Sequence, residues 1–299
     1  IVDTSDEWIV QRTGIKERHI AKENEFTSDL AAEAARRALA DAKIPAEELE
    51  LIIVGTVTPD YFTPSTACVV QKLLGAKNAA AFDINAACSG FVTGLTVAEQ
   101  FLKGGVYKNA LVVCADVLSK ATDYADRSTC VLFGDGAGAA VLTADGEGIL
   151  STWIGADGTG GEKLTSLAYR EDEAELEKRV SKRKNTVSMA GGEVMKFAVK
   201  IMAKAADKVV ADAGLVWDDI NLIVPHQANL RIIDSAAKRL GISTDRMYIN
   251  VDRYANTSAA SIPIALCEAR DKGLVKHGDR VVLVGFGGGL TWGACVIEY

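Results

Sequence analysis

The sequence predicts an α/β protein built from two similar halves, each a parallel-core sheet covered by helices. Short apolar runs of strand length alternate with longer segments whose apolar residues recur at helical spacing, which is the pattern of helix-covered parallel sheets. The chain also repeats internally. Residues 40–44 can be laid on 211–215, and 47–53 then falls on 218–224 without a gap, at a constant offset of 171.

Each expected element follows from a local pattern. Thr27-Ser28-Asp29 opens an alanine-rich segment as N-capping residues do, which predicts a helix over 27–42. Gly134 to Gly138 precedes a strand and opens no helix, so it is a turn rather than a phosphate-binding loop. Strands are expected at 51–55, 79–84, 110–114, 139–142, 222–224, 281–284 and 293–297, and further helices at 66–74, 91–102, 196–208 and from about 257.

Composition narrows the function classes. The chain has 299 residues, 48% of them hydrophobic, and a net charge of −7, which disfavours a nucleic-acid partner. No apolar run approaches the ~20 residues of a membrane span, and no signal-peptide pattern is present. The six cysteines match no zinc spacing, so we expect reduced thiols, no metal and a cytoplasmic protein.

Ala86 to Phe91 is the stretch around which the first half is organised. Cys88 lies where an apolar strand turns into a helix, and the positive end of a helix favours a thiolate. Small neighbours on both sides would let a substrate approach closely. Taken alone, Cys88 is better explained as a small buried hydrophobe.

Two polar residues of the second half, His226 and Asn256, are expected to lie near Cys88. His226 directly follows the strand at 222–224, and Asn256 begins the helix that mirrors the one after Cys88. A pseudo-twofold arrangement would bring all three side chains into one pocket at the carboxyl ends of the strands. Alternatively, His226 is a surface histidine and Asn256 a helix N-cap. Gly285 to Gly289 either points backbone N–H groups at a carbonyl oxygen or forms a tight turn.

Four motifs in order resemble β-ketoacyl-[acyl-carrier-protein] synthase III: 86–91, 225–231, 256–261 and 285–293, together with an N-terminal signature at 2–9 and 12–15. The resemblance covers almost the whole chain. It implies a thiolase-like fold, layered αβαβα with mixed sheets, divided into residues 1–150 and 151–299. It also implies a homodimer and no cofactor. The family's first strand would precede Ile1, so the first half is expected to lack a strand.

The resemblance further implies the initiating condensation of type II fatty-acid synthesis. A short acyl-CoA would acylate Cys88, and malonyl-acyl-carrier-protein would then decarboxylate and condense to give 3-oxoacyl-acyl-carrier-protein, CoA and CO2. His226 and Asn256 would hold the malonyl thioester carbonyl. The backbone N–H groups of Cys88 and Gly288 would form the oxyanion hole.

Other residues receive roles by the same resemblance. CoA would contact Trp8, Arg12, Thr13, Arg127 and Asn229, and the carrier protein would dock on Lys196, Gln227, Ala228, Asn229, Leu230 and Arg231. The acyl pocket would include Phe286, and Thr63 on a loop contributed by the dimer partner. The alternatives are a polyketide-type condensing enzyme or related thiolase-fold acyltransferase with other starters, a cysteine hydrolase, and a non-catalytic acyl-CoA-binding protein.

Overall fold

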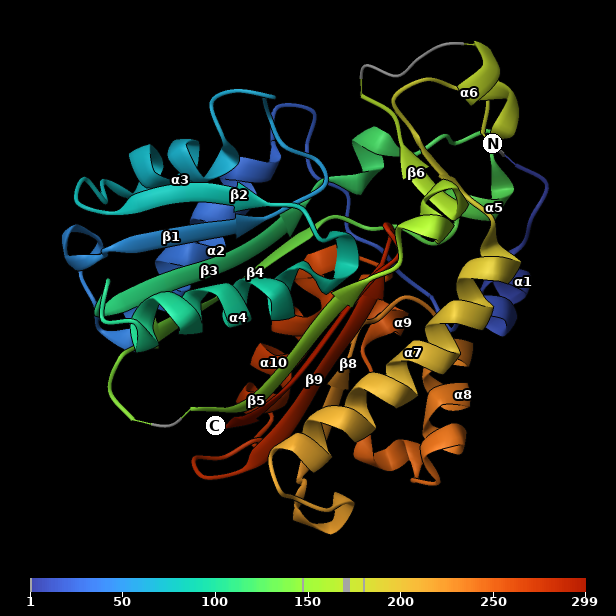
Figure 1. Cartoon of the computed structure of the whole chain (residues 1–299). Coiled ribbons are helices and arrows are strands. Elements are labelled where there is room, and N and C mark those ends of the chain that lie inside the picture. Colours follow the sequence, from blue (N-terminus) through green and yellow to red (C-terminus); the bar gives the residue numbers. More distant parts are fainter. Residues whose placement is uncertain (1, 147, 169–172, 180) are drawn as a thin grey trace.

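The structure is a computed structural model that describes residues 2–146, 148–168, 173–179 and 181–299 (Figure 1). The helices are α1 (Asp6–Thr13), α2 (Thr27–Ala42), α3 (Thr66–Leu74), α4 (Gly90–Lys103), α5 (Arg127–Cys130), α6 (Glu173–Lys178), α7 (Gly191–Asp212), α8 (Leu230–Leu240), α9 (Val251–Tyr254) and α10 (Ser261–Asp271). The strands are β1 (Leu51–Gly55), β2 (Ala80–Ile84), β3 (Asn109–Asp116), β4 (Gly136–Thr143), β5 (Ile149–Ala156), β6 (Leu164–Ser166), β7 (Val187–Met189), β8 (Leu222–Pro225), β9 (Arg280–Gly287) and β10 (Thr291–Glu298).

Two four-stranded sheets form the frame, in the orders β2-β1-β3-β4 and β5-β10-β9-β8. In the first sheet β2, β1 and β3 run parallel and β4 is antiparallel to β3. In the second sheet β8 and β9 are parallel, and β10 is antiparallel to both of its neighbours, β9 and β5. Helices α2 and α3 cover the outer face of the first sheet, α7 and α8 lie on the outer side of the second, and α4 and α10 lie between the sheets (Figure 1). This confirms the predicted αβαβα layering.

The offset found in the sequence is exact for two pairs of strands. β8 begins 171 residues after β1, and β9 begins 171 residues after β3. Strand residues alternate between two hydrophobic cores: Leu51 and Ile53 face the central core between the sheets, whereas Ile52 and Val54 face the core under α2 and α3. Because both faces are buried, these strands are continuous apolar runs.

The predicted division at residue 150 lies within two residues of the start of the second sheet. β5 begins at Ile149 and pairs along its length with β10, so the connection between the halves lies before it. The segment after α1 also packs on the second half: Ile15 lies in a small core with Val251, and the N–H of Lys16 donates to the carbonyl of Asp252 at 2.9 Å. No helix in the described part of the chain is long and apolar enough to cross a membrane.

Candidate active site

Cys88 lies in a short 3-10 turn, 87–89, that leads into α4. The turn is anchored by Phe91, which is buried in the central core, and by the hydroxyl of Ser89, which donates to the carbonyl of Ala86 at 2.7 Å. β9 lies directly against it: a side chain at Gly287 would place a Cβ 2.5 Å from the backbone N of Cys88. Glycine at this position therefore allows the second sheet to contact the turn.

The Cys88 thiol is buried, with 9% of the residue exposed. Burial raises the pKa of the thiol to about 12; a hydrogen bond with Ser258 opposes this shift and the nearby charge of Asp116 adds to it. Burial therefore opposes the thiolate that the helix N-terminus was expected to favour.

His226 follows β8 and is 1% exposed. Its Nδ1 lies 2.7 Å from the hydroxyl of Ser261, which itself accepts the backbone N–H of Gln227 at 3.3 Å. The Ser261 hydroxyl fits either tautomer, since it has one proton and two acceptor lone pairs; when it donates to Nδ1, the ring proton lies on Nε2. Burial lowers the pKa of His226 to about 3, so the imidazole is neutral and acts as a donor. The ring of Phe286 packs edge-on against the imidazole, with the two ring centroids 5.2 Å apart.

Asn256 comes from the second half but is held by the first. Its backbone N–H donates to the carbonyl of Leu132 at 2.9 Å, and its carbonyl accepts from Gly134 at 3.0 Å. The side-chain Oδ1 accepts the N–H of Ser258 at 2.9 Å. The amide nitrogen is thereby the end left to donate into the pocket.

One pocket of about 280 Å³ joins these three side chains to the protein surface. Most residues to which the sequence assigned a role line it: Trp8, Arg12, Thr13, Cys88, Arg127, His226, Ala228, Asn229, Arg231, Asn256 and Phe286. Its lining combines the exposed Arg12 and Arg127 and the half-buried Trp8 with a buried thiol, an imidazole and a carboxamide. Such a lining suits a ligand with an anionic head and a reactive carbonyl.

The mouth of the pocket is built on α1. Ser5 caps this helix by accepting the N–H of Trp8 at 3.2 Å, and Gly14 ends it with a φ of 80°. The guanidinium groups of Arg12 and Arg127 lie 5.5 and 5.0 Å from the Trp8 ring centroid. An adenine ring between Trp8 and Arg127 needs a gap of about 7 Å, twice the contact distance, so one of them must move to admit it.

Three of the predicted docking residues differ in their surroundings. Gln227 is 1% exposed: its amide donates to the carbonyls of Pro225 and Tyr248, and its Oε1 accepts from two backbone N–H groups. Gln227 therefore cannot present its side chain to a carrier protein, and the prediction that it docks one is wrong. Arg231 is exposed and donates to the carbonyl of Gln11, while Lys196 is exposed and paired with Glu193 at 2.9 Å.

Three other predicted residues lie outside this pocket. Gly288 directly follows Gly287, which contacts the backbone of Cys88. A Cβ at Gly288 would lie 3.1 Å from the carbonyl oxygen of Leu164. Leu230 packs with Ile15 in the small core beneath α1. Thr63 lies on the exposed loop that also carries Tyr61 and Phe62, which are 59% and 69% exposed.

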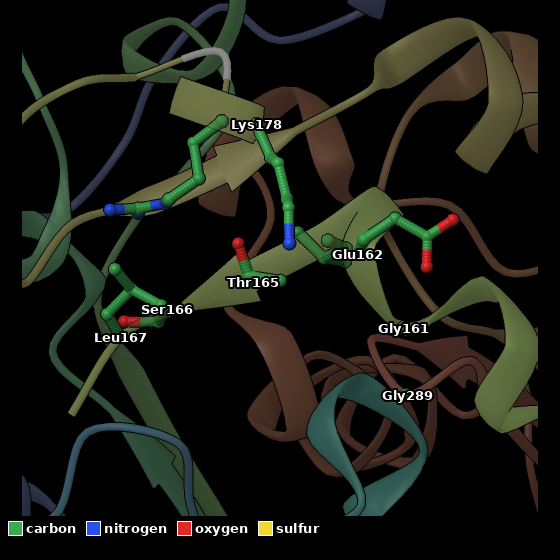
Figure 2. A pocket seen from close by; sticks show the side chains of 9 residues that line it. Gly161, Glu162, Thr165, Ser166, Leu167, Lys178 and Gly289 are labelled. Carbon is green, nitrogen blue, oxygen red and sulfur yellow. The ribbon is translucent and has the colours of Figure 1, made fainter. Parts of the chain in front are cut away.

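A second pocket, of about 410 Å³, lies beside the β6–β7 hairpin and shares Leu164 with the first. Figure 2 shows Lys178 extending over Thr165, with Glu162 pointing away from it. None of the predicted catalytic side chains lines this pocket. The described residues contain no cluster of three or more His, Cys, Asp or Glu side chains that could hold a metal ion.

Three residues in the site were missed by the sequence analysis: Ser258, Ser261 and Asp116. The two serines were visible only as part of the motif at 256–261, and Asp116 ends a strand that was expected to stop at residue 114. A serine two or five residues after an asparagine carries no signal by itself. Its role depends on which strand end it meets.

Comparison with known proteins agrees with this geometry. The family models "3-Oxoacyl-[acyl-carrier-protein (ACP)] synthase III" and its C-terminal part match residues 82–158 and 210–299. The chain is 55% identical over 301 residues to the β-ketoacyl-[acyl-carrier-protein] synthase III of Caldanaerobacter subterraneus subsp. tengcongensis, covering 100% of this chain and 91% of that protein.

Solved structures lead to the same family. The 3-oxoacyl-[acyl-carrier-protein] synthase III of Aquifex aeolicus VF5 matches with a TM-score of 0.92 and 48% identity, over 100% of this chain and 92% of that chain. A priming β-ketosynthase of the R1128 polyketide pathway matches with a TM-score of 0.90 and 37% identity, over 99% and 88%. The fold is the expected thiolase-like one, and the chain belongs to the β-ketoacyl-[acyl-carrier-protein] synthase III family of condensing acyltransferases.

Proposed function

We propose that this enzyme condenses a short acyl-CoA with malonyl-acyl-carrier-protein in two half-reactions that share one pocket. The observation that carries the proposal is that pocket: a buried thiol, a neutral imidazole and a carboxamide meet at its end, and a basic aromatic cluster forms its mouth. No cofactor takes part in the proposal, because the thioester substrates supply both the activated acyl group and the carboxylate that leaves.

In the first half-reaction, the Cys88 sulfur attacks the thioester carbonyl of the acyl-CoA. The tetrahedral oxyanion is stabilised by backbone N–H groups, for which Cys88 and Gly288 are the candidates. CoA leaves, and the acyl group remains on sulfur. Covalent capture divides a difficult condensation into two easier steps.

In the second half-reaction, the malonyl carboxylate leaves as CO2 and negative charge develops on the thioester oxygen. His226 and Asn256 suit this step because each supplies a neutral donor, Nε2–H and Nδ2–H respectively. Neutral donors stabilise an enolate without protonating the carbanion that must attack the acyl-enzyme. The attack returns Cys88 as a thiolate.

The pocket mouth is the proposed site for CoA and then for the carrier protein's phosphopantetheine arm. Arg12, Arg127 and Trp8 suit a phosphorylated nucleotide, because guanidinium groups pair with phosphate and stack on aromatic rings. Arg231 at the rim suits an acidic carrier protein on a chain whose net charge is otherwise −7.

A homodimer is part of the proposal. The loop at 58–65, with its exposed Tyr61 and Phe62, would reach the partner's acyl pocket. Thr63 on that loop would leave room for longer or branched starters. The second candidate is a polyketide-type priming enzyme, favoured by the likeness to the R1128 ketosynthase. A panel of acetyl-, isobutyryl- and longer acyl-CoA primers would separate the two.

The direct test is single-turnover labelling with radioactive acetyl-CoA. Wild-type protein should retain label, and Cys88→Ala should retain none; a labelled Cys88→Ala protein would refute the nucleophile. Asn256→Ala should acylate at a rate near that of the wild type but decarboxylate malonyl-acyl-carrier-protein about 10²-fold more slowly. Equal loss in both half-reactions would contradict the role given to Asn256.

Docking is tested by charge reversal. Arg231→Glu should raise KM for malonyl-acyl-carrier-protein about tenfold or more and change KM for acetyl-CoA less. Arg239→Glu, on the same helix but away from the pocket, is the matched control. An unchanged carrier-protein KM in Arg231→Glu would remove this residue from the docking surface.

A further inference from the structure

A serine of the second half lies against the Cys88 thiol, and the two half-reactions do not yet use it. The Sγ of Cys88 lies 3.5 Å from the hydroxyl oxygen of Ser258, which is 2% exposed. No other side chain in the described residues hydrogen-bonds this sulfur. The contact therefore joins the reacting atom of the first half to one hydroxyl of the second half.

The backbone around Ser258 fixes the position of this hydroxyl. Ser258 begins a short 3-10 turn, 258–260, that mirrors the cysteine turn, and its φ of 53° is left-handed. Its N–H donates to Oδ1 of Asn256 at 2.9 Å. The two turns pack closely, because a Cβ at Gly90 would lie 3.0 Å from the Cβ of Ala259. Ser258 thus orients the carboxamide through its backbone and contacts the thiol through its side chain.

A hydroxyl suits both protonation states of the sulfur. It carries one proton and two lone pairs, so rotation about its Cβ–Oγ bond lets it accept from a thiol or donate to a thiolate. A hydrogen bond to a charged acceptor is about twice as strong as one between neutral groups. The contact between Ser258 and Cys88 is therefore stronger when the sulfur is negative than when it is protonated.

The surroundings of the sulfur make such a donor important. The titratable side chains that face it are Asp116, buried at the end of β3, and His226 across the pocket. Burial and the charge of Asp116 both raise the pKa of the thiol, whereas the hydrogen bond with Ser258 acts to lower it. His226 is neutral, because burial lowers its pKa to about 3, so it brings no positive charge to the sulfur.

We propose that the Ser258 hydroxyl is the hydrogen-bond donor that stabilises the Cys88 thiolate, both when it forms during acylation and when it leaves during condensation. The proposal rests on the two half-reactions proposed above. Because the hydroxyl touches the reacting sulfur, Ser258 is a catalytic residue that the second half supplies to the nucleophile of the first.

No proton is transferred to Ser258 in either step. During acylation the thiol proton passes to solvent, the S–C bond forms as the C–S bond to CoA breaks, and the departing CoA thiolate takes up a proton. During condensation the carbanion left by CO2 forms a C–C bond to the acyl carbon. The C–S bond to Cys88 then breaks, its electron pair stays on sulfur, and the thiolate regains a proton from solvent.

The first test measures the contact itself by Raman spectroscopy. The S–H stretching band of Cys88 is isolated by subtracting the spectrum of Cys88→Ala, which removes the bands of the other five cysteines. In Ser258→Ala this band should move to higher wavenumber, because the thiol loses its acceptor. A band at the same wavenumber in both proteins would overturn the proposal.

The second test measures thiolate formation without any substrate. The alkylation rate of Cys88 by iodoacetamide is followed by mass spectrometry of its peptide, since Cys68 and Cys267 are also exposed. Below the thiol pKa the rate should rise about tenfold per pH unit in wild type and in Ser258→Ala. The Ser258→Ala rates should lie about three- to tenfold lower, because loss of thiolate outweighs its greater nucleophilicity. Coincident rates would refute the thiolate donor.

The third test separates the thiol from the carboxamide. Ser258→Ala should slow single-turnover acylation by acetyl-CoA by a similar factor. It should decarboxylate malonyl-acyl-carrier-protein at the wild-type rate, because the N–H at position 258 still orients Asn256. Asn256→Ala should show the opposite pattern. Equal slowing of acylation and decarboxylation in Ser258→Ala would overturn the proposal.

Matched variants cover structural damage. Alanine already adopts this backbone at the equivalent Ala87, whose φ is 46°, and Ser258→Gly removes the hydroxyl where glycine is unstrained. Ser258→Gly should acylate as slowly as Ser258→Ala. Ser119→Ala, which removes a hydroxyl that donates to Asp135 at 2.6 Å outside the pocket, should keep the wild-type rate. Wild-type protein that takes up no label would refute the proposed function itself, whereas labelling of both position-258 variants at the wild-type rate would refute only the thiolate donor.

Discussion

The two halves share a backbone but divide the chemistry between them. Aligned at the offset of 171 residues, three pairs of equivalent positions each place one residue on the pocket lining, and in each pair one half has a functional side chain while the other has almost none. The pairs are His226 with Gly55, Asp116 with Gly287, and Cys88 with Ala259. At each of these positions, one half has a functional side chain, and the other half has a small residue that leaves space for it.

The turns before α4 and α10 make the comparison sharpest. Ala87 and Ser258 are equivalent and both have a left-handed φ, 46° and 53°. The asparagine two residues earlier accepts a backbone N–H in each turn, at 3.3 Å for Asn85 and 2.9 Å for Asn256. Yet Asn85 is exposed and Asn256 lines the pocket. The same backbone therefore presents a sulfur from one half and an amide and a hydroxyl from the other.

The largest expected effect comes from filling the space that one half leaves for the other. In Gly287→Ala, the new methyl group would lie 2.5 Å from the backbone N of Cys88. The turn must shift, and a displacement of about 1 Å in a catalytic group costs ~10²-fold in rate. We expect single-turnover acylation to fall by at least that factor. Gly158→Ala, where a Cβ meets nothing within 4 Å, is the control; similar rates in both variants would contradict the close contact.

The buried imidazole has no equivalent in the first half, and this asymmetry predicts a pH effect on stability. The pKa of His226 is lowered to about 3, below its unfolded value of about 6.5. Between these values the unfolded chain binds a proton that the folded chain does not, so stability falls as the pH falls. From about pH 6.5 to 4.5 the loss is about 2–3 kcal/mol.

His226→Gln should remove that loss. Urea unfolding across this pH range should give a flatter profile in His226→Gln than in wild type, and the exposed His277→Gln should keep the wild-type profile. Parallel profiles for wild type and His226→Gln would show that the imidazole is not held neutral by burial.

Much of the fold could be predicted because apolar spacing decides it. The strand at 51–55 and the helix at 27–42 have the predicted bounds, and the strand predicted at 222–224 extends one residue further, to Pro225. The N-terminal helix α1 and the strands β5 to β7 were not predicted. α1 is mostly polar and exposed, and it owes its start to one capping contact from Ser5. β6 and β7 have three residues each, too few to show a period.

The site was predicted less completely than the fold. The meeting of Cys88, His226 and Asn256 followed from the repeat, because equivalent strand ends lie together. Burial of Gln227 did not follow, since Ala228 and Asn229 after it line the pocket and only the fold turns its amide inward. The state of the thiol could not be predicted either, because hydration loss depends on everything packed around it.

A smaller effect on the reaction rate is expected from Ser261, which orients the imidazole donor of the second half. Ser261 is equivalent to Gly90, and when its hydroxyl donates to Nδ1 it holds the Nε2–H form of His226. Ser261→Ala should leave Nδ1 without a partner, so that part of the imidazole changes tautomer. We expect about tenfold slower decarboxylation of malonyl-acyl-carrier-protein with acylation changed less. Equal slowing of both half-reactions would indicate a general loss of structure instead.

The smallest expected effect is on the free energy of unfolding and comes from a site far from the pocket. There the two halves end equivalent helices with different residues. Lys43 and Gly214 end equivalent helices with left-handed φ values of 57° and 69°. A lysine pays a steric penalty there that glycine does not. Lys43→Gly should therefore raise the free energy of unfolding by about 0.5–1 kcal/mol, after the added unfolded-state entropy is subtracted. Gly214→Ala should lower it by a similar amount, because a Cβ there meets nothing within 4 Å and only the backbone term changes. If both substitutions shift the urea midpoint in the same direction, a side chain at this left-handed position does not carry the same free-energy cost in the two halves, although their backbones agree.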